Sequence, residues 1–343
     1  MSIVAPLSAK PSPRYDIAVV IPCYRVGNHI AGVLERIGSE VSCVFCIDDA
    51  SDDDTAAVIR DCQEHDSRIQ LINRETNGGV GAATLDGYRT AIADGARVLV
   101  KIDGDGQMAP ELVGQFAAPV LRGEADYVKG NRFFSMATVR AMPGSRIVGN
   151  AGLSFLTKLS TGYWDLFDPT NGFTAIQADV AAALPLEQIH PRYFFESDLL
   201  FRLGTIRARV LELPLVSSYG GETSYLSELR SLFSFPLLHL RNLIKRIVYN
   251  YFLRNFSLAS INLVAGLGLI AFGALFGATT WVQVLQSGQP ATAGTVMLVA
   301  LPLLLGVQLL LGFLAHDIAA TPRDVIHPNI AQVRILSFKQ AAE

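Results

Sequence analysis

Short apolar runs alternate with amphipathic segments along residues 16–105. Four runs are continuous and rich in β-branched residues, as expected of strands buried on both faces: Ile17–Ile21, Cys43–Ile47, Ile69–Ile72 and Val98–Ile102. Segments with helical spacing lie between them, near residues 28–38, 54–65 and 79–94. This alternation of strands and helices predicts an α/β fold with a mostly parallel sheet.

The pattern is less regular from residue 128 to about 225. Loop-like stretches at 135–145 and 160–172 precede an expected helix near 194–203 and an expected strand at 209–216. We expect one catalytic domain over residues 16–225, preceded by a flexible tail at 1–15 that contains three prolines.

The longest apolar region lies near the C-terminus. Residues 255–316 contain no Asp, Glu, Lys or Arg. A polar turn at Gln286–Pro290 divides them into two expected membrane spans, near 257–281 and 293–315, within a hairpin over 255–318. Basic residues precede the first span, and Arg323 follows the second. They predict that the catalytic domain and both termini, including the tail 319–343, are cytoplasmic.

Residues 226–254 are amphipathic. Leucine, isoleucine and aromatic residues recur at spacings of three and four, with Arg230, Arg241, Lys245 and Arg246 mostly on the other side. Pro236 predicts a break. The pattern favours helices in the membrane interface whose polar side faces headgroup phosphates, with packing against the sheet as the alternative.

Composition narrows the range of partners. The chain has 28 Lys and Arg against 31 Asp and Glu, which disfavours a nucleic-acid partner. Hydrophobic residues make up 50% and charged residues 17%, which points to contact with lipid. Cys43 and Cys46 stand three apart in an expected strand, so they should face opposite sides of the sheet and not share a metal.

Polar residues follow the expected strands at the points where ligands bind to parallel sheets. Asp103 and Asp105 come directly after a buried strand and, in an extended segment, would point the same way, while Gly104 allows a tight turn. Such a pair is a hard oxygen site for Mg²⁺ or Mn²⁺ carrying a diphosphate, to which Gln107 can add an amide oxygen. A turn without a metal is the alternative.

Several motifs together resemble family 2 glycosyltransferases with the GT-A fold. In order along the chain they are Val20–Tyr24, Asp48–Thr55, Asn77–Ala83 and Asp103–Gln107. Three later motifs resemble the branch that contains dolichyl-phosphate mannose synthase and bacterial polyprenyl-phosphate glycosyltransferases: Gly130–Phe133, Asp168–Phe173 and Phe194–Asp198. The resemblance implies a Rossmann-like GT-A domain with interface helices and two transmembrane helices.

The resemblance also assigns roles to residues. It implies a nucleotide pocket lined by Pro22, Tyr24, Asp49, Asp103, Gly104 and Asp105, in which Asp49 accepts a hydrogen bond from the base or ribose. It implies a divalent ion held by Asp103, Asp105 and Gln107. It places the acceptor phosphate on Arg132 and Arg146, and makes Asp103, Arg132 and Asp168 catalytic, with Asp168 in a catalytic or acceptor-orienting role.

The expected activity is inverting transfer of a sugar from a UDP- or GDP-sugar to a polyisoprenyl phosphate at the cytoplasmic membrane face. A phosphate monoester is mostly dianionic at neutral pH and needs little deprotonation before it attacks. A lipid hydroxyl acceptor, which would need Asp168 or Asp198 as a base, and a non-catalytic membrane scaffold are the alternatives. Homo-oligomers are left open.

Two carboxylates in an apolar segment are expected to need partners, and two histidines are expected to be structural or interfacial. Glu196 and Asp198 lie in an apolar helix and need partners, with Arg202 a candidate for Asp198. His190 and His239 are isolated from other candidate ligands and are expected to be structural or interfacial.

Overall fold

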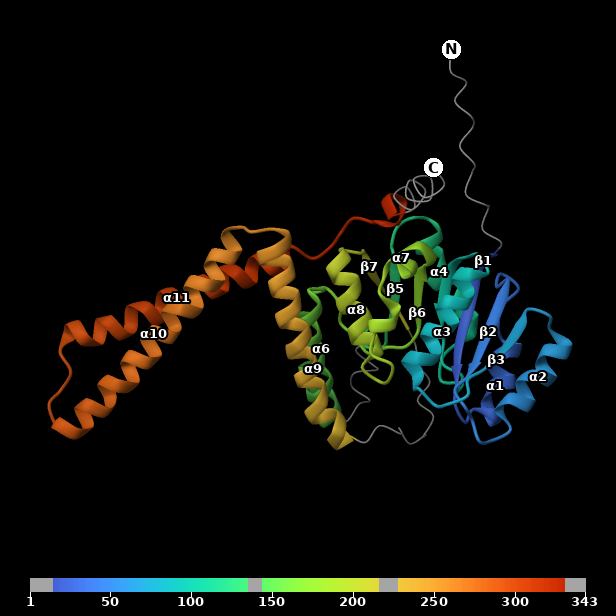
Figure 1. Ribbon diagram of the computed structural model, residues 1–343, viewed down its shortest axis with the longest axis horizontal. Coiled ribbons are helices and arrows are strands. Elements are labelled where there is room, and N and C mark those ends of the chain that lie inside the picture. Colours follow the sequence, from blue (N-terminus) through green and yellow to red (C-terminus); the bar gives the residue numbers. More distant parts are fainter. Residues whose placement is uncertain (1–14, 135–143, 216–227, 331–343) are drawn as a thin grey trace, which may run out of the picture. The chain divides into compact units, whose positions relative to one another are not determined.

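A seven-stranded sheet forms the framework of the larger of two compact units (Figure 1). The computed structural model describes residues 15–134, 144–215 and 228–330. The larger unit comprises 1–239 with 322–343, and the hairpin unit comprises 240–321. The strands are β1 (Tyr15–Cys23), β2 (Cys43–Asp48), β3 (Ile69–Asn73), β4 (Ala96–Lys101), β5 (Tyr127–Asn131), β6 (Thr174–Gln177) and β7 (Val210–Pro214).

The strand order is β3-β2-β1-β4-β6-β5-β7. Only β6 runs antiparallel to its neighbours in the described sheet, so the predicted mostly parallel α/β fold is confirmed. Cys46 packs in the hydrophobic core on one face of the sheet and Cys43 in the core on the other, as their spacing predicts.

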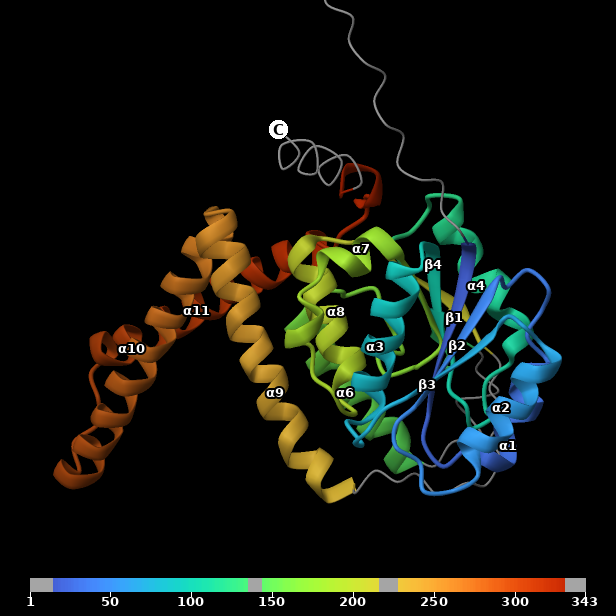
Figure 2. The same cartoon turned by 45° about the vertical axis from the view of Figure 1, so that its right-hand side comes forward.

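Helices cover both faces of this sheet (Figure 2). One core contains residues of α1 (Gly27–Glu35), α2 (Thr55–His65) and α4 (Val113–Leu121). The other contains residues of α3 (Val80–Ala93), α7 (Ala178–Ala183) and α8 (Phe195–Ile206). Two short 3-10 helices, η1 (Pro110–Leu112) and η2 (Leu186–Gln188), precede α4 and α8. The three helices predicted before residue 105 are therefore present.

The region after residue 128 contains more structure than its pattern predicted. Helix α6 (Gly144–Thr161) packs on α8, and β6 is inserted between β4 and β5. The expected helix at 194–203 and strand at 209–216 correspond to α8 and β7. The loop expected at 135–145 lies mostly outside the described residues, as does the tail at 1–15.

Helix α9 (Glu228–Val248) continues through Pro236, so the predicted break there is wrong. Contacts on both sides of the proline offset the missing hydrogen bond. Phe235 packs edge-to-face on Phe194, and His239 on the same ring, with centroid distances of 5.5 and 4.8 Å.

The hairpin unit contains α10 (Leu258–Ser287) and α11 (Ala293–Ala319), each long and apolar enough to cross a membrane. Both extend beyond the predicted spans. No charged side chain interrupts the first helix before Gly288, which ends it in a left-handed conformation (φ 65°). Gly266 and Gly306 let the two helices pack closely, because a Cβ on Gly266 would lie 3.0 Å from the Gly306 carbonyl oxygen.

A buried ion pair joins the ends of the hairpin unit. Arg246 donates to both carboxylate oxygens of Asp317 at 2.6 and 2.9 Å, and the hydroxyl of Tyr251 donates to the same carboxylate at 2.5 Å. Tyr251 belongs to a π-helical segment, η3 (Tyr249–Arg254). The prediction that Arg246 faces headgroups is therefore wrong, because this side chain is 2% exposed and neutralises Asp317. Apolar residues of α9 such as Leu240 and Ile244 are exposed instead.

The segment after the hairpin returns to the larger unit. Asp126, fully buried before β5, accepts hydrogen bonds from the backbone amides of Ile326 and His327 and contacts the His327 ring at 2.8 Å. This contact fixes the start of the C-terminal segment, of which residues 331–343 lie outside the described part.

Candidate active site

The expected nucleotide-binding residues lie at the carboxyl ends of β1 and β2. Pro22 is buried near the end of β1, while Tyr24, just beyond it, is 44% exposed. Arg25 and Ala50, which follow the two strands, have left-handed backbones (φ 55° and 59°). Strained residues of this kind often occur at ligand sites, and here two of them flank one edge of the sheet.

Asp49 holds the glycine loop that precedes α3. Its two carboxylate oxygens accept the backbone amides of Gly78 and Gly79 at 2.9 and 2.7 Å, and Arg74 pairs with one of them. The carboxylate is 2% exposed and thus already bound within the protein. Contact with a base or ribose stays a prediction, and the role of Arg74 was missed because it lies 25 residues away in sequence.

The metal motif forms a turn, which Asp103 precedes and to which Asp105 belongs. β4 ends at Lys101, and the chain turns at residues 104–106 with Gly106 at φ 78°. The segment is therefore not extended, and the tight turn expected at Gly104 is present. Asp105 accepts the backbone amide of Gln107 at 3.0 Å, which fixes the turn.

A buried lysine, not identified from the sequence, contacts the first aspartate of the motif. The Lys101 Nζ lies 2.7 Å from Asp103 Oδ1 and 3.4 Å from Glu196 Oε1. The lysine is 1% exposed. Burial alone would lower its pKa, but the negative charges of Asp103 and Glu196 outweigh burial and raise it above its ordinary value. The sequence signal for this contact was a lysine within an apolar strand. Lys101 is also the partner that the Glu196 carboxylate was expected to need.

The motif suits a divalent cation in its chemistry. Asp103 and Asp105 offer hard carboxylate oxygens and are partly exposed, and Gln107 is exposed beside them. The Lys101 ammonium already acts as a cation against Asp103. Across the described ranges, no cluster of three or more His, Cys, Asp or Glu is arranged to hold a metal.

A polar row crosses the sheet beside this motif. The register pairs Lys101 of β4 with Thr174 of β6, Thr174 with Lys129 of β5, and Lys129 with Glu212 of β7. Paired residues face the same side of a sheet. The two buried lysines therefore lie in one row, which connects the metal motif to the residues around Asp168.

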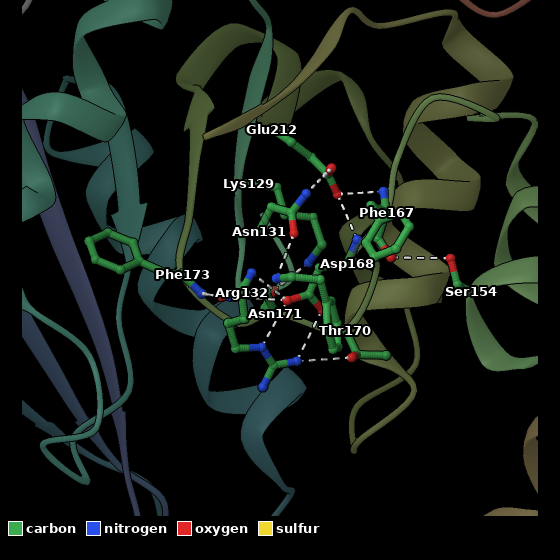
Figure 3. A network of polar contacts seen from close by, with 11 residues as sticks. Lys129, Asn131, Arg132, Ser154, Phe167, Asp168, Thr170, Asn171, Phe173 and Glu212 are labelled. Carbon is green, nitrogen blue, oxygen red and sulfur yellow. Dashed lines mark hydrogen bonds and ion pairs between the residues drawn. The ribbon is translucent and has the colours of Figure 1, made fainter. Parts of the chain in front are cut away.

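Arg132 and Asp168 form a bidentate pair at the other end of this row (Figure 3). Arg132 Nε and Nη2 lie 2.8 and 3.0 Å from the two carboxylate oxygens, and the Arg132 backbone amide donates to the same group at 3.0 Å. Asp168 is fully buried and Arg132 is 26% exposed. Burial would raise the pKa of Asp168, but the hydrogen bonds and charge of Arg132 hold it below its ordinary value.

Glu212 supports Asp168 from behind, as Figure 3 shows. One Glu212 oxygen accepts the backbone amides of Phe167 and Asp168, both at 2.8 Å, and the other accepts the Asn131 side chain at 2.9 Å. Burial raises the pKa of Glu212. This residue was not predicted, because it lies in a strand 44 residues from Asp168.

Lys129 holds the turn that follows Asp168. Its ammonium donates to the Asn171 backbone carbonyl. Burial lowers the pKa of Lys129 to about 8. The next residue, Gly172, lies against the metal motif, since a Cβ there would be 2.8 Å from Asp103 Oδ2 and 2.6 Å from Lys101 Nζ. The structure thus brings the metal motif and the Arg132–Asp168 pair together.

The remaining predicted residues divide into two groups. Arg146 lies on α6, but its side chain is outside the described part of the structure. Asp198 accepts the backbone amide of His190 at 2.9 Å, while Arg202 contacts Gln188. Asp198 of α8 therefore holds the backbone at His190, whereas Arg202, its expected partner, binds Gln188.

Comparisons with known proteins identify the family. Residues 18–184 match the model of the family described as "Glycosyl transferase family 2". An undecaprenyl-phosphate mannosyltransferase from Micrococcus luteus is 30% identical over 202 residues, which are 58% of this chain and 82% of that protein. The chain belongs to glycosyl transferase family 2.

A second relative of this family 2 glycosyltransferase is also named as a sugar transferase. A UDP-N-acetylglucosamine–dolichyl-phosphate N-acetylglucosaminyltransferase from Methanococcus voltae is 28% identical over 59% of this chain and 86% of its own. The fold also resembles glucosyl-3-phosphoglycerate synthase from Mycobacterium tuberculosis, solved with Mn²⁺, UDP-glucose and phosphoglyceric acid. The TM-score is 0.50 at 21% identity, covering 68% of this chain and 80% of that one. The GT-A fold and glycosyltransferase activity implied by the motifs are confirmed.

Proposed function

We propose that this glycosyltransferase moves a sugar from a nucleoside diphosphate sugar to a polyprenyl phosphate at a membrane surface. Two relatives are named for dolichyl or undecaprenyl phosphate acceptors, and two apolar helices follow the catalytic unit. The observation that carries the proposal is the proximity of the Asp103 motif to the Arg132–Asp168 pair through Gly172. A donor diphosphate and an acceptor phosphate need neighbouring sites of these two kinds.

Asp103, Asp105 and Gln107 would hold a Mg²⁺ or Mn²⁺ ion on the donor diphosphate. Such a cation supplies positive charge that stabilises the diphosphate as it leaves. Pro22, Tyr24 and Asp49 border the same sheet edge on the nucleotide side. In this proposal Asp49 acts by holding the Gly78–Gly79 amides, which shape that side of the pocket.

Arg132 and Arg146 would bind the acceptor phosphate, because guanidinium groups bind phosphate in two-point geometry. Asp168 fixes Arg132 through both of its oxygens, so we assign it an orienting role rather than that of a base. An acceptor phosphate oxygen attacks the anomeric carbon as the bond from that carbon to the diphosphate oxygen breaks. The nucleoside diphosphate leaves with the electron pair, and the anomeric configuration inverts.

The catalytic unit and both termini would lie in the cytoplasm. Arg241, Lys245 and Arg254 precede the hairpin and Arg323 follows it, whereas the turn between the spans carries no charge. The bias of basic residues toward cytoplasmic flanks supports this orientation.

Transfer into lipid tests the proposal. Membranes containing the full chain and added polyprenyl phosphate are incubated with radiolabelled UDP- and GDP-sugars, with and without EDTA. We expect one donor to label an organic-extractable lipid, and EDTA or Asp105→Asn to abolish the label. Asp61→Asn, at an exposed carboxylate on α2, is the matched control and should retain activity. Failure of every donor to label lipid would refute the assignment.

A further inference from the structure

Lys101 places a fixed positive charge at the metal motif. Its ammonium lies between Asp103 Oδ1 at 2.7 Å and Glu196 Oε1 at 3.4 Å. A pair this close between a buried lysine and a partly exposed carboxylate means that one of the two motif carboxylates is already neutralised within the protein.

The surrounding structure keeps that charge in place. Lys101 is the last residue of β4 and 1% exposed, and its side chain faces the polar row beside Thr174. Gly172 closes over it, since a Cβ at that position would overlap Nζ at 2.6 Å. The ammonium cannot move to solvent without opening this packing, so it stays beside Asp103 when a second cation approaches.

We propose that Lys101 is a resident counter-cation, which weakens binding of a free divalent ion so that the ion binds together with the donor diphosphate. This inference rests on the proposed function. Asp103, Asp105, Glu196 and Lys101 together carry a formal charge of about −2, against about −3 for the three carboxylates without the lysine. A divalent ion entering alone meets this reduced negative charge and a nearby ammonium.

The donor supplies what the protein lacks. In the described parts of the chain no third His, Cys, Asp or Glu joins the two aspartates in a cluster, and Gln107 can add only a neutral amide oxygen. Diphosphate oxygens add both ligands and negative charge, which outweigh the repulsion from Lys101. The ion's affinity therefore depends on the nucleotide, and the site avoids filling with metal in the absence of donor.

Binding of Mn²⁺ to the full chain in detergent micelles tests this role without measuring transfer. The signal of free aqueous Mn²⁺ in electron paramagnetic resonance gives the dissociation constant with no nucleotide, with UDP and with GDP. In the unsubstituted protein we expect UDP or GDP to tighten Mn²⁺ binding by at least about tenfold. Equal affinity with and without both nucleotides would overturn the inference.

Two variants isolate the lysine. Lys101→Met should tighten binding of free Mn²⁺ by about tenfold or more, because the nearest positive charge is gone. The double variant Lys101→Met/Glu196→Gln removes the Glu196 charge together with the lysine, so that no unpaired carboxylate is left to disturb folding. It should also tighten binding of free Mn²⁺. Lys158→Met, at a partly buried lysine of α6, removes a positive charge outside the site, is the control, and should leave Mn²⁺ affinity within about twofold.

The outcomes separate this inference from the proposed function. Nucleotide-dependent Mn²⁺ binding that is unchanged or weaker in the Lys101 variants would refute the counter-cation while leaving the glycosyltransferase assignment intact. Absence of Mn²⁺ binding in the unsubstituted protein, even with UDP or GDP, would refute both the metal site and the role of Lys101.

Discussion

The buried imidazole of His239 makes the stability of the larger unit depend on pH. This residue of α9 is 1% exposed, and its Nδ1 lies 2.8 Å from the Ser160 hydroxyl on α6. Ser160 also donates to the Thr157 carbonyl at 3.2 Å, so the hydroxyl oxygen is left to accept from His239 Nδ1. The other ring nitrogen, Nε2, has no hydrogen-bond partner among the described residues. Protonation would bury a charge there, and burial lowers the pKa of His239 to about 4.

The magnitude follows from proton linkage. The unfolded chain binds a proton near pH 6.5 and the folded chain only near pH 4, so the unfolded state binds more protons between these values. Stability is therefore lost as pH falls through this window. For these two pKa values the loss on going from about pH 7.5 to about pH 5 is about 2 kcal/mol. That corresponds to about 4–8 °C in Tm for a unit of this size.

Thermal unfolding of the full chain in detergent, followed at both pH values, measures this difference. His239→Leu removes the titrating group while Ser160 keeps its bond to Thr157, so the variant should lose about 4–8 °C less than the unsubstituted protein on acidification. His65→Gln, at an exposed histidine of α2, is the control and should leave the acid sensitivity nearly unchanged. An equal acid shift in His239→Leu and the unsubstituted protein would refute the reasoning.

Three further perturbations address the ion pairs and the close approach at Gly172. Arg246→Met should destabilise the hairpin unit by about 3–5 kcal/mol, because it leaves the Asp317 carboxylate buried and unpaired, and the double variant with Asp317→Leu should recover most of the lost Tm. The ion pair of Asp168 with Arg132 stabilises the fold at pH values above about 3.9, the pKa of an aspartate in the unfolded chain, and this stabilisation is lost as the pH falls below that value. Asp168→Asn should therefore lower Tm at neutral pH and make Tm less dependent on pH in the acid range. Gly172→Ala should weaken Mn²⁺–UDP binding by about tenfold, since the added Cβ displaces the metal-motif carboxylate, whereas Gly149→Ala, where a Cβ meets nothing within 4 Å, should not.

The first half of the sheet and the two apolar helices were predictable because their patterns are local. β1, β2 and β4 are buried on both faces, so their sequences read as continuous apolar runs. The first apolar helix was found for the same reason, because no charged residue interrupts it before Gly288.

The middle of the chain was not predictable in the same way. β6 is only four residues long, and its place between β4 and β5 depends on strands far away in sequence. A short buried strand and a helix segment cannot be told apart by periodicity alone.

The residues that support the site depend on tertiary pairing. The motifs and the family resemblance identified Asp103, Arg132 and Asp168 as candidates, but not that Arg132 binds Asp168 or that Lys101 binds Asp103. Each pair forms only when strands of different sequence position come into register. For the same reason Arg246 was assigned to the polar side of an amphipathic helix, whereas Asp317, 71 residues later, draws it inward.

The fate of the acceptor phosphate tests the central claim most directly. Polyprenyl phosphate carrying radioactive phosphorus is incubated with the full chain, Mn²⁺ and the UDP- or GDP-sugar that labels lipid, and then treated with alkaline phosphatase. Transfer to the phosphate converts a monoester into a sugar phosphodiester, so the account predicts that the radioactive phosphorus becomes resistant to phosphatase and sensitive again after mild acid. Sugar transfer into lipid while the labelled phosphate stays fully sensitive to phosphatase would contradict it and point to a hydroxyl acceptor.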